Sequence, residues 1–457
     1  MPSAAVNQQP PNLDKYLKSL KGFPLESSIE RLTSRAPDNN SLLKRRQIRG
    51  SECCAIATAH ILLQVVARGK WQDVDGLLEA VYATGRRLVD AQPTELVVAN
   101  IVRRVLALIR DEAAEDRNEP SSEPPSIAPM SPVVDATPPT QKSWSLPETV
   151  VARQDSVGDF PPSRAGLFPS YSSSNIPKSL FHLLSASPPS DFASAPSSSF
   201  RNSGTSTPTG RAGPVNNSQE STLRSEVIDG IEEILDEISQ VDDQIAAQAD
   251  AQIHPGDHVL VHRPSPTVQR FILRAALKRQ FTVLITAEMP RPHSAPTDPH
   301  AAFAKKLSAA GINSIVLRSA ASTAYMPRID KVILGVRAIL ANGGVVADSG
   351  AATLARAAHQ AGRAVVALAG IYKLSPEHPF DEESLIEWAS PSTFVGFDDG
   401  PLVQGVEVRS AATELVPPEL VDMYMTNLGT HSRDHLASLI ADHYKPEDAG
   451  FHLSSDG

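Results

Sequence analysis

Two different hydrophobic patterns divide the chain. Between residues 11 and 115, apolar residues recur every three or four positions, the spacing that places them on one face of a helix. From residue 254 onwards, short apolar runs alternate with amphipathic stretches, which is typical of strands joined by helices. Between these parts no periodicity persists. The sequence therefore predicts two folded parts separated by a segment without regular structure.

The N-terminal pattern predicts a small bundle of helices. Its clearest helix begins at Pro93, because proline suits the first helical turn. Similar patterns from Ala55 to Val66 and from Val74 to Leu88 predict two more helices, separated at Gly69, the second of them ending near Gly85. The buried stripe of the helix after Pro93 is expected to contain Val98, Ile101, Val102, Val105, Leu106 and Ile109.

The C-terminal pattern predicts an α/β fold with a doubly wound parallel sheet, a Rossmann-like domain. Its helical stretches are Thr267–Leu277, Ala301–Ala310 and Ala351–Ala361. Strands that are apolar throughout are typical of a parallel sheet covered by helices on both faces. The five apolar runs are Val259–Val261, Val283–Ile285, Ile315–Leu317, Val332–Leu334 and Val365–Leu368.

A segment rich in proline and serine separates the two parts. Residues 121–220 contain 16 Pro and 23 Ser, which leaves too little apolar area to offset the entropy of ordering the chain. We predict that this insert is disordered. The expected organisation is a helical domain at 11–115, the insert at 116–221, a connecting helix at 222–253 and the Rossmann-like domain at 254–450.

The charge of the chain is unevenly distributed. A net charge of −10 argues against general affinity for DNA, for other nucleic-acid backbones or for anionic membranes. Residues 41–110 nevertheless carry 11 basic and 6 acidic side chains, a local charge of +5. The basic pairs Arg86-Arg87 and Arg103-Arg104 fall outside the predicted buried stripes, so we expect them to be solvated or to contact an anionic protein partner.

The two cysteines and the apolar segments indicate a cytosolic protein. Cys53 and Cys54 are adjacent within a helical pattern, where a mutual disulfide would be strained, so a reducing compartment is expected. No apolar run approaches the roughly 20 residues that a membrane span requires, and the N-terminus lacks the layout of a signal peptide. We interpret the two cysteines as buried side chains and not as catalytic nucleophiles, because the sequence pairs no base with them.

The loops after the predicted strands are the natural place to search for a ligand site. The turn Asn342-Gly343-Gly344 could offer backbone N–H groups to a phosphate, but glycine is also the default residue of a plain turn. Neither a Gly-x-Gly-x-x-Gly nor a Walker motif follows a strand, so no nucleotide cofactor is predicted. His254, His258 and His262 stand at steps of four, but Pro255-Gly256 breaks any helix there, so no metal is predicted.

Several segments of the two folded parts have a familiar sequence. They are Gly85–Leu88, Ala91–Glu95, Asn100–Leu106, Asp330–Gly335, Ile339–Gly343, Lys373–Pro376, Val416–Leu420 and Ala441–Asp448. As a set they resemble the beta-subunit branch of the initiation factor 2B alpha/beta/delta family. The resemblance covers about 15–115 and 222–450 and excludes the insert.

The same resemblance allows an enzymatic function to be tested, because this family shares its fold with methylthioribose-1-phosphate and ribose-1,5-bisphosphate isomerases. It implies that Arg263 stands where those enzymes have a catalytic Cys, and that Arg337 stands where they have a catalytic Asp. Ala347-Asp348 replaces an Asn-Lys pair that holds their substrate. An arginine cannot replace the catalytic thiol as an acid or a base, and the negative charge of Asp348 repels a phosphate. Catalysis would require a thiol and a carboxylate from elsewhere in the chain.

By resemblance, the function is that of a non-catalytic regulatory subunit in a guanine nucleotide exchange complex. That complex contains alpha, beta, gamma, delta and epsilon subunits and converts initiation factor 2 from its GDP-bound to its GTP-bound form. It is inhibited when the alpha subunit of initiation factor 2 is phosphorylated. Two alternatives stay open: a sugar-phosphate isomerase, and a homo-oligomeric ligand-sensing protein unrelated to translation.

Overall fold

The computed structural model describes residues 11–118, 216–287, 300–378 and 382–448, except for residue 21, residues 34–41 and 44–45, and most of 391–404. The predicted insert at 116–221 lies outside the described residues apart from its two ends, so its disorder stays a prediction. The parts of the chain before residue 121 and after residue 214 pack as one unit.

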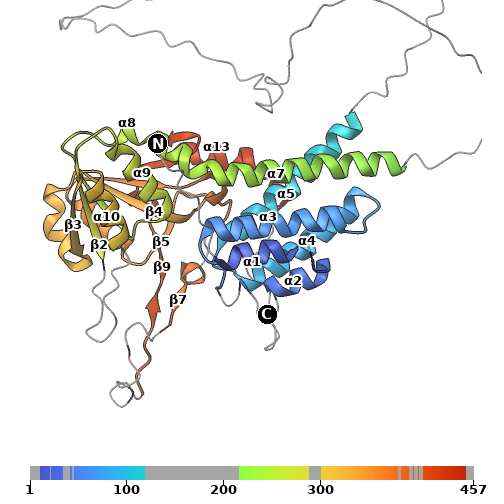
Figure 1. The fold of residues 1–457 in the computed structure, drawn as a ribbon, viewed down its shortest axis with the longest axis horizontal. Coiled ribbons are helices and arrows are strands. Elements are labelled where there is room, and N and C mark those ends of the chain that lie inside the picture. Colours follow the sequence, from blue (N-terminus) through green and yellow to red (C-terminus); the bar gives the residue numbers. More distant parts are fainter. Residues whose placement is uncertain are drawn as a thin grey trace, which may run out of the picture. The chain divides into compact units, whose positions relative to one another are not determined.

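The N-terminal part is helical, as predicted (Figure 1). Helix α5 packs against α3, α4 and α7, and all the residues of its predicted stripe are buried. Their burial on one face explains why this sequence forms a long helix at this position. The helices are α1 (Pro11–Leu20), α2 (Leu25–Thr33), α3 (Ser51–Arg68), α4 (Val74–Ala91) and α5 (Leu96–Asn118).

Two predicted helix boundaries are wrong. Helix α4 does not end near Gly85 but continues to Ala91, because a glycine inside a helix costs only about 1 kcal/mol and burial of Leu88 and Val89 offsets it. Helix α5 begins at Leu96 instead of at Pro93, since a turn closed by the Glu95 N–H and the Gln92 carbonyl precedes it.

Helix α7 (Asn216–Ala247) links the helical part to the sheet and is followed by the short α8 (Ala249–Gln252). One face of α7 packs against α3 and α5, and its C-terminal part packs against α9 (Figure 1). Val227, Ile231, Ile238 and Val241 are buried on that face. The predicted connecting helix is present. Among the described residues, no helix is long and apolar enough to cross a membrane.

The C-terminal part is built on a mostly parallel sheet with strand order β11-β10-β6-β4-β1-β2-β3. The five predicted apolar runs are strands β1, β2, β3, β4 and β6, and the predicted fold class is confirmed. Only β11 runs antiparallel to its neighbour along this path. The strands are β1 (His258–His262), β2 (Thr282–Ala287), β3 (Asn313–Arg318), β4 (Lys331–Ile339), β6 (Ala364–Leu368), β10 (Met423–Thr426) and β11 (Gly429–His431).

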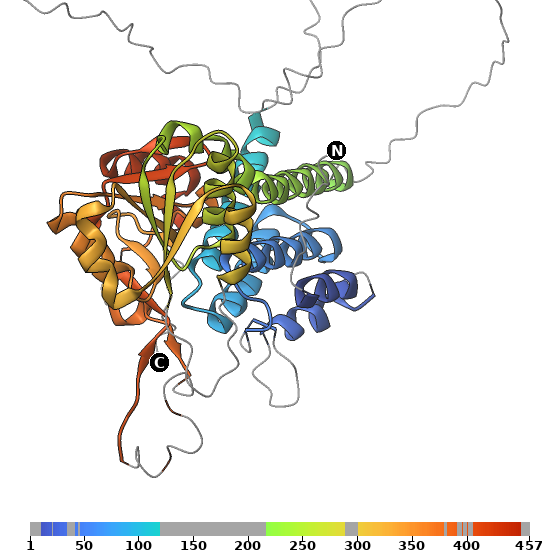
Figure 2. The ribbon, with the colours of Figure 1, turned by 60° about the vertical axis from the view of Figure 1, so that its left-hand side comes forward.

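Alternate residues of the central strands contribute to two different hydrophobic cores. Val259 and Val261 of β1 join the core formed with α3, α5, α7, α9 and α10, whereas Leu260 joins the core of the opposite face. This alternation follows from the period of two in a strand. Figure 2 shows the helices on both sides of the sheet. The covering helices of this part are α9 (Pro266–Ala276) and α10 (Ala301–Ala309) on one face, and α12 (Ala351–Gln360) and α13 (Arg433–His443) on the other.

Strand β4 is longer than its predicted apolar run Val332–Leu334. Strand β4 extends to Ile339 and pairs antiparallel with β5 (Val345–Asp348), which in turn pairs with β9 (Thr413–Val416). The sequence Asn342-Gly343-Gly344 is therefore a hairpin turn, in which Gly343 has a φ of 87° that favours glycine. The plain-turn interpretation of this sequence holds.

Short elements complete the described fold. They are η1 (Ser319–Ala321), α11 (Ser322–Tyr325), η2 (Met326–Arg328), η3 (Ile371–Lys373), η4 (Glu382–Leu385), β7 (Trp388–Ala389), β8 (Ser410–Ala411), η7 (Pro418–Leu420) and η8 (Pro446–Asp448).

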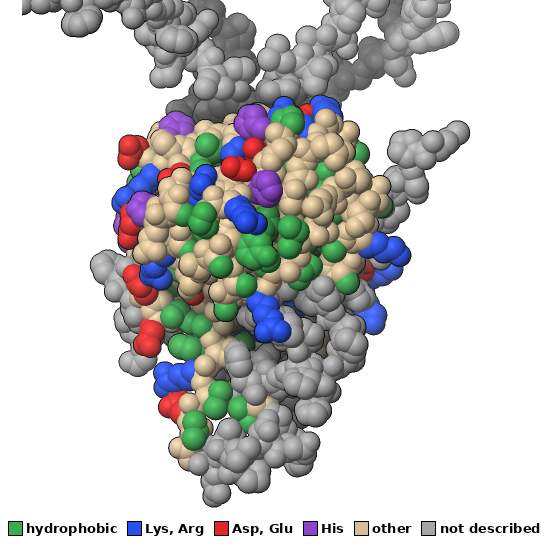
Figure 3. Space-filling model, turned by 90° about the vertical axis from the view of Figure 1, so that its left-hand side faces the viewer, with side chains coloured by type: hydrophobic (Ala, Val, Ile, Leu, Met, Phe, Trp, Pro, Cys, Tyr) green, Lys and Arg blue, Asp and Glu red, His purple; other side chains and the backbone are tan. Residues whose placement is uncertain are grey.

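Strand β3 is the last strand at one end of the sheet order, on the side of the molecule that Figure 3 faces. Hydrophobic side chains lie among scattered charged ones on this side (Figure 3). Val316 of β3 is 50% exposed, and Ile315 is partly exposed. An edge strand with exposed apolar side chains can pair with or pack against another chain.

Candidate functional site

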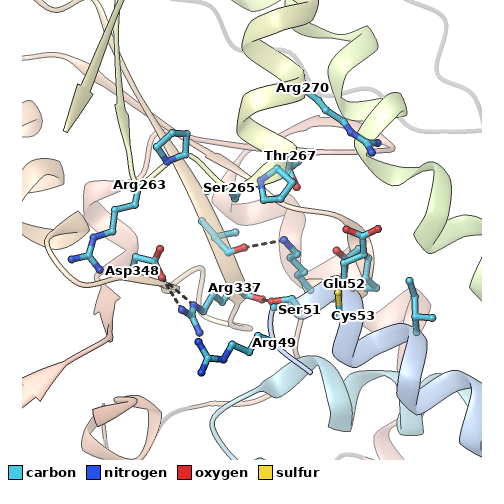
Figure 4. Close-up of a pocket in the computed structure, with 18 of the residues that line it drawn as sticks. Arg49, Ser51, Glu52, Cys53, Arg263, Ser265, Thr267, Arg270, Arg337 and Asp348 are labelled. Atoms are coloured by element: carbon cyan, nitrogen blue, oxygen red, sulfur yellow. Dashed lines mark hydrogen bonds and ion pairs between the residues drawn. The ribbon is translucent and has the colours of Figure 1, made fainter. Parts of the chain in front are cut away.

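A cavity of about 790 Å³ lies at the carboxyl ends of β1 and β4, against the first turn of α3 (Figure 4). This is the end of a parallel sheet where ligands bind in α/β proteins. The lining combines residues from the helical part and from the sheet, and includes Arg49, Ser51, Glu52, Cys53, Arg263, Ser265, Thr267, Arg270, Arg337, Asp348, Tyr372 and Lys373.

The loop after β1 is fixed by a helix cap and a close approach. Ser265 caps α9 by accepting a hydrogen bond from the Val268 N–H, and Pro266 occupies the first helical turn. A Cβ at Gly335 would lie 2.6 Å from the Ser265 Oγ, so only glycine allows β4 to pass this loop. Arg263 has a φ of 40°, a conformation that costs a non-glycine residue about 1–3 kcal/mol.

Arg337 is held by two carboxylates. Its guanidinium donates to the Asp348 Oδ1 at 3.1 and 2.9 Å and to the Glu387 Oε2 at 3.0 Å. Glu387 also forms an ion pair with Arg46. At the place where the resemblance implies a catalytic acid and a substrate lysine, the described residues thus form an internal salt-bridge network.

The cavity is lined by a thiol and by carboxylates that come from other positions than the catalytic residues of the isomerases. Cys53 and Glu52 come from α3, and Figure 4 shows them together on the α3 side of the cavity. Burial, aided by the charge of Glu52, raises the pKa of Cys53 to about 11. Burial also raises the pKa of the adjacent Cys54. Both thiols therefore stay protonated near neutral pH, and neither is an activated nucleophile.

Two further buried groups were not found by sequence reasoning. Glu95 accepts a hydrogen bond from the Ser51 Oγ at 2.7 Å, and burial raises the pKa of its carboxyl. Lys373 lines the cavity with its side chain almost fully buried. No local motif marks either residue, because the pocket forms only when segments far apart in sequence meet.

The N-terminus of α12 is already occupied by a carboxylate. The Glu414 Oε1 accepts hydrogen bonds from the Gly350 N–H at 2.8 Å and from the Ala352 N–H at 2.6 Å. Such a helix end attracts anions. A phosphate at this position would have to displace the glutamate.

The three histidines at steps of four do not converge. His254 and His258 face Asp257 and Asp330 near the surface, whereas His262 is buried between the Thr286 hydroxyl and the Ser349 carbonyl. Among the described residues, no group of three or more His, Cys, Asp or Glu side chains has the arrangement of a metal site.

Arg103 and Arg104 are not solvated in the folded chain, and their contact with a partner stays a prediction. Arg103 is 1% exposed and pairs with Glu377 at 2.7 Å, and Arg104 pairs with Glu237 at 2.6 Å. Both lie off the predicted stripe of α5, but that side of the helix packs against other parts of the chain. Their charges are used within the molecule.

The other basic pair lies on α4 at the surface. Arg86 is exposed, with its guanidinium 5.9 Å from the centroid of the Tyr82 ring. Arg87 is 41% exposed and pairs with Glu26 on α2 at 2.6 Å. Arg86 and Arg87 are thus more accessible to a partner than Arg103 and Arg104, and their role in partner binding stays a prediction.

Comparison with known proteins identifies the family. The sequence profile of the initiation factor 2 subunit family matches residues 47–432, so the chain belongs to this family. A protein of Schizosaccharomyces pombe described as translation initiation factor eIF2B subunit beta is 33% identical over 406 residues, which cover 89% of this chain and 94% of that protein. The resemblance to beta subunits that the sequence indicated is confirmed.

The chain is similar to a solved structure of the same family along nearly its whole length, and to isomerases along only part of it. A chain in the crystal structure of the tetrameric eIF2B-beta2-delta2 complex from Chaetomium thermophilum is 38% identical, with a TM-score of 0.62, and the match covers 95% of this chain and 100% of that one. A ribose 1,5-bisphosphate isomerase of Pyrococcus furiosus is 26% identical over 223 residues, which cover only 48% of this chain and 67% of that enzyme. The similarity to isomerases is thus more distant and more limited.

Proposed function

We propose that this chain is the regulatory beta-type subunit of a cytosolic initiation factor 2B complex and does not itself catalyse a reaction. The observation that carries the proposal is the similarity to beta subunits along nearly the whole chain. The proposed partners are the alpha, gamma, delta and epsilon subunits and initiation factor 2, especially its phosphorylated alpha subunit. The complex exchanges GDP for GTP on that factor, and phosphorylation inhibits the exchange.

The chemistry of the cavity supports a role without catalysis. Arg263 and the Arg337–Asp348 pair occupy the positions at which the resemblance implies catalytic and substrate-binding groups. Both thiols near the cavity have raised pKa values. An isomerase would require a different set of acids and bases, so the isomerase remains the weaker alternative.

The exposed apolar side of the sheet supports assembly with another subunit. Val316 on the edge strand β3 and Leu277 after α9 are 50% and 71% exposed. One relative forms a complex with delta subunits, as the description of its structure states. We infer that this chain packs with a delta-type subunit through its α/β part and joins the regulatory core of the complex. The proposal keeps the domain boundaries expected from the sequence, at 11–115, 116–221, 222–253 and 254–450.

Affinity purification of the full chain from its own cells tests the proposal. The expected result is stoichiometric recovery of the four other subunits, with exchange activity in the purified complex. The same chain expressed alone should not convert ribose 1,5-bisphosphate. Recovery of a homo-oligomer without partners would contradict the proposal, and turnover of the sugar phosphate would favour the isomerase.

The surface pair Arg86-Arg87 offers a direct prediction. Reversing both charges by Arg86→Glu and Arg87→Glu should weaken binding of phosphorylated initiation factor 2 to the assembled complex more than binding of the unmodified factor, because charge-assisted contacts to phosphate are lost. Binding of the two forms is measured by fluorescence anisotropy or surface plasmon resonance.

A matched control places the same change elsewhere on the surface. Arg328→Glu and Arg356→Glu alter two exposed arginines, of η2 and α12, outside the helical part. These variants should bind both forms like the unchanged complex. Equal affinity of the Arg86-Arg87 variant for both forms, at the level of the unchanged complex, would remove this pair from the proposed interface.

A further inference from the structure

Lys373 is a buried amine beside an open cavity. It ends the short η3 helix after β6, lines the cavity and is only 6% exposed. Its Nζ donates one hydrogen bond, to the Val336 carbonyl at 3.1 Å. Within the part of the chain that the structure describes, Lys373 has no ion pair. A charged ammonium group with one acceptor and little water is costly at such a position.

The surroundings of Lys373 favour its uncharged form. Burial lowers the pKa of the ammonium group, and the charge of Arg337 acts in the same direction. The carboxylates of Asp242, Glu95 and Glu52 oppose this effect, but burial is the largest influence. The uncharged amine of a lysine is a nucleophile.

Glu52 lies in the same cavity and can supply a proton. Burial raises the pKa of its carboxyl, and the charge of Asp242 acts in the same direction. Glu52 and Lys373 both line the cavity, so the two groups face a shared space. The cavity of about 790 Å³ leaves room for a small molecule beside them.

We propose that Lys373 is a covalent binding site for a small aldehyde or ketone. The Nζ lone pair attacks the carbonyl carbon, and the oxygen takes up a proton to give a carbinolamine. The carbon–oxygen bond then breaks, with Glu52 donating a proton to the departing oxygen, and a carbon–nitrogen double bond forms. Overall the nitrogen loses two hydrogens, which leave with the carbonyl oxygen as water, and no oxidant or reductant takes part.

This site is independent of the proposed role in initiation. It uses a residue that takes no part in the Arg337–Asp348–Glu387 network, and it requires no catalytic turnover. A lysine with a purely structural role would be shielded from the cavity. Lys373 instead lines the cavity together with Glu52 and Cys53.

Reductive trapping tests the proposal on the full chain. The purified protein is incubated with glycolaldehyde and sodium cyanoborohydride near neutral pH, and the modified lysines are located by peptide mass spectrometry over time. We expect Lys373 to be labelled before Lys305, an exposed lysine of α10, and we expect this preference to disappear in denaturant. Labelling that follows exposure, with Lys305 ahead of Lys373, would overturn the proposal.

Variants provide the matched controls. Lys373→Arg should lose the label at this position and keep that at Lys305. Glu52→Gln should slow the labelling of Lys373 without changing that of Lys305, and an unchanged rate would overturn the role of Glu52. If Lys373→Arg does not fold, the order in which Lys373 and Lys305 are labelled in the unchanged protein still tests the proposed site.

Discussion

The buried carboxyl of Glu95 makes the stability of the fold depend on pH. Because burial raises its pKa above the ordinary value of 4.5, the folded state favours the protonated form. The contribution of protonated Glu95 to the free energy of unfolding is fully present below pH 4.5. It is lost as the pH rises through the folded-state pKa. Glu95→Gln removes this titration, so we expect the stability of the variant relative to the unchanged protein to increase from pH 5 to pH 8, as measured by urea unfolding.

The hydroxyl of Ser51 provides the control for this prediction. Its hydrogen bond lowers the pKa of Glu95, so Ser51→Ala should make the pH dependence steeper in the unchanged background. In the Glu95→Gln background the same substitution should not affect the pH dependence. A difference in stability between Glu95→Gln and the unchanged protein that is constant over this pH range would contradict the assignment.

Single residues were the least predictable level of this structure. Periodicity identified the apolar stripe of α5 correctly, but it assigned Arg104 to solvent because a helical pattern does not reveal what covers the opposite face. Glu95 and Lys373 were missed for a related reason. Each is buried by contacts with segments that are distant in sequence, and neither belongs to a recognisable motif. By contrast, the resemblance pointed to the arginines at positions 263 and 337, and both line the cavity.

At the level of elements, the N-terminus of α12 depends on a side chain from another strand. Glu414 of β9 accepts hydrogen bonds from two of its free N–H groups. Glu414→Ala should therefore destabilise the fold by about 1–2 kcal/mol, and Glu414→Gln, which keeps an acceptor but loses the charge, by about 0.3–1 kcal/mol. Denaturant unfolding measures both changes.

Hydrogen exchange separates this cap from a general loss of stability. The Gly350 and Ala352 amides should exchange faster in Glu414→Ala than in the unchanged protein under native conditions. Glu419→Ala, which alters an exposed residue nearby, should change stability by less than about 0.5 kcal/mol and leave these amides unaffected. Unaltered exchange at both amides in Glu414→Ala would show that the glutamate does not cap the helix.

The sequence predicted the elements with long, regular patterns and missed those with short ones. Strands β1, β2, β4 and β6 were found because they lie inside the sheet and their central residues are buried and apolar. The edge strand β3 was found from its apolar run Ile315–Leu317, although Val316 is 50% exposed. Strands β5 and β9 were missed, since both are short and antiparallel, and β5 directly follows the glycine turn at Asn342-Gly343-Gly344. The predicted run of β4 was too short, because Gly335 and Arg337 interrupt its apolar residues.

A shared apolar core and several polar contacts join the helical part to the sheet. The cavity itself depends on this arrangement, since Ser51 and Arg337 both line it although 286 positions separate them in the sequence. Composition and periodicity predict each part, but they contain no information on which surfaces of the two parts meet.

Arg103 is the buried centre of that connection. Its guanidinium donates to the Glu377 Oε1 at 2.7 Å and to the Asp448 carbonyl at 3.2 Å, which ties α5 to the loop after η3 and to η8. Arg103→Met should destabilise the fold by about 3–5 kcal/mol, because it leaves the charge of Glu377 partly buried without its partner. Denaturant unfolding of the full chain measures this loss.

Two further variants distinguish a connection between the parts from a local effect. Arg104→Met breaks an ion pair with Glu237 that lies within the helices, so it should leave hydrogen exchange in 445–448 unchanged, whereas Arg103→Met should accelerate it. Adding Glu377→Gln to Arg103→Met should recover part of the lost stability, since the unpaired charge is then removed. If the two arginine variants have the same effect on exchange in 445–448, Arg103 does not connect the two parts.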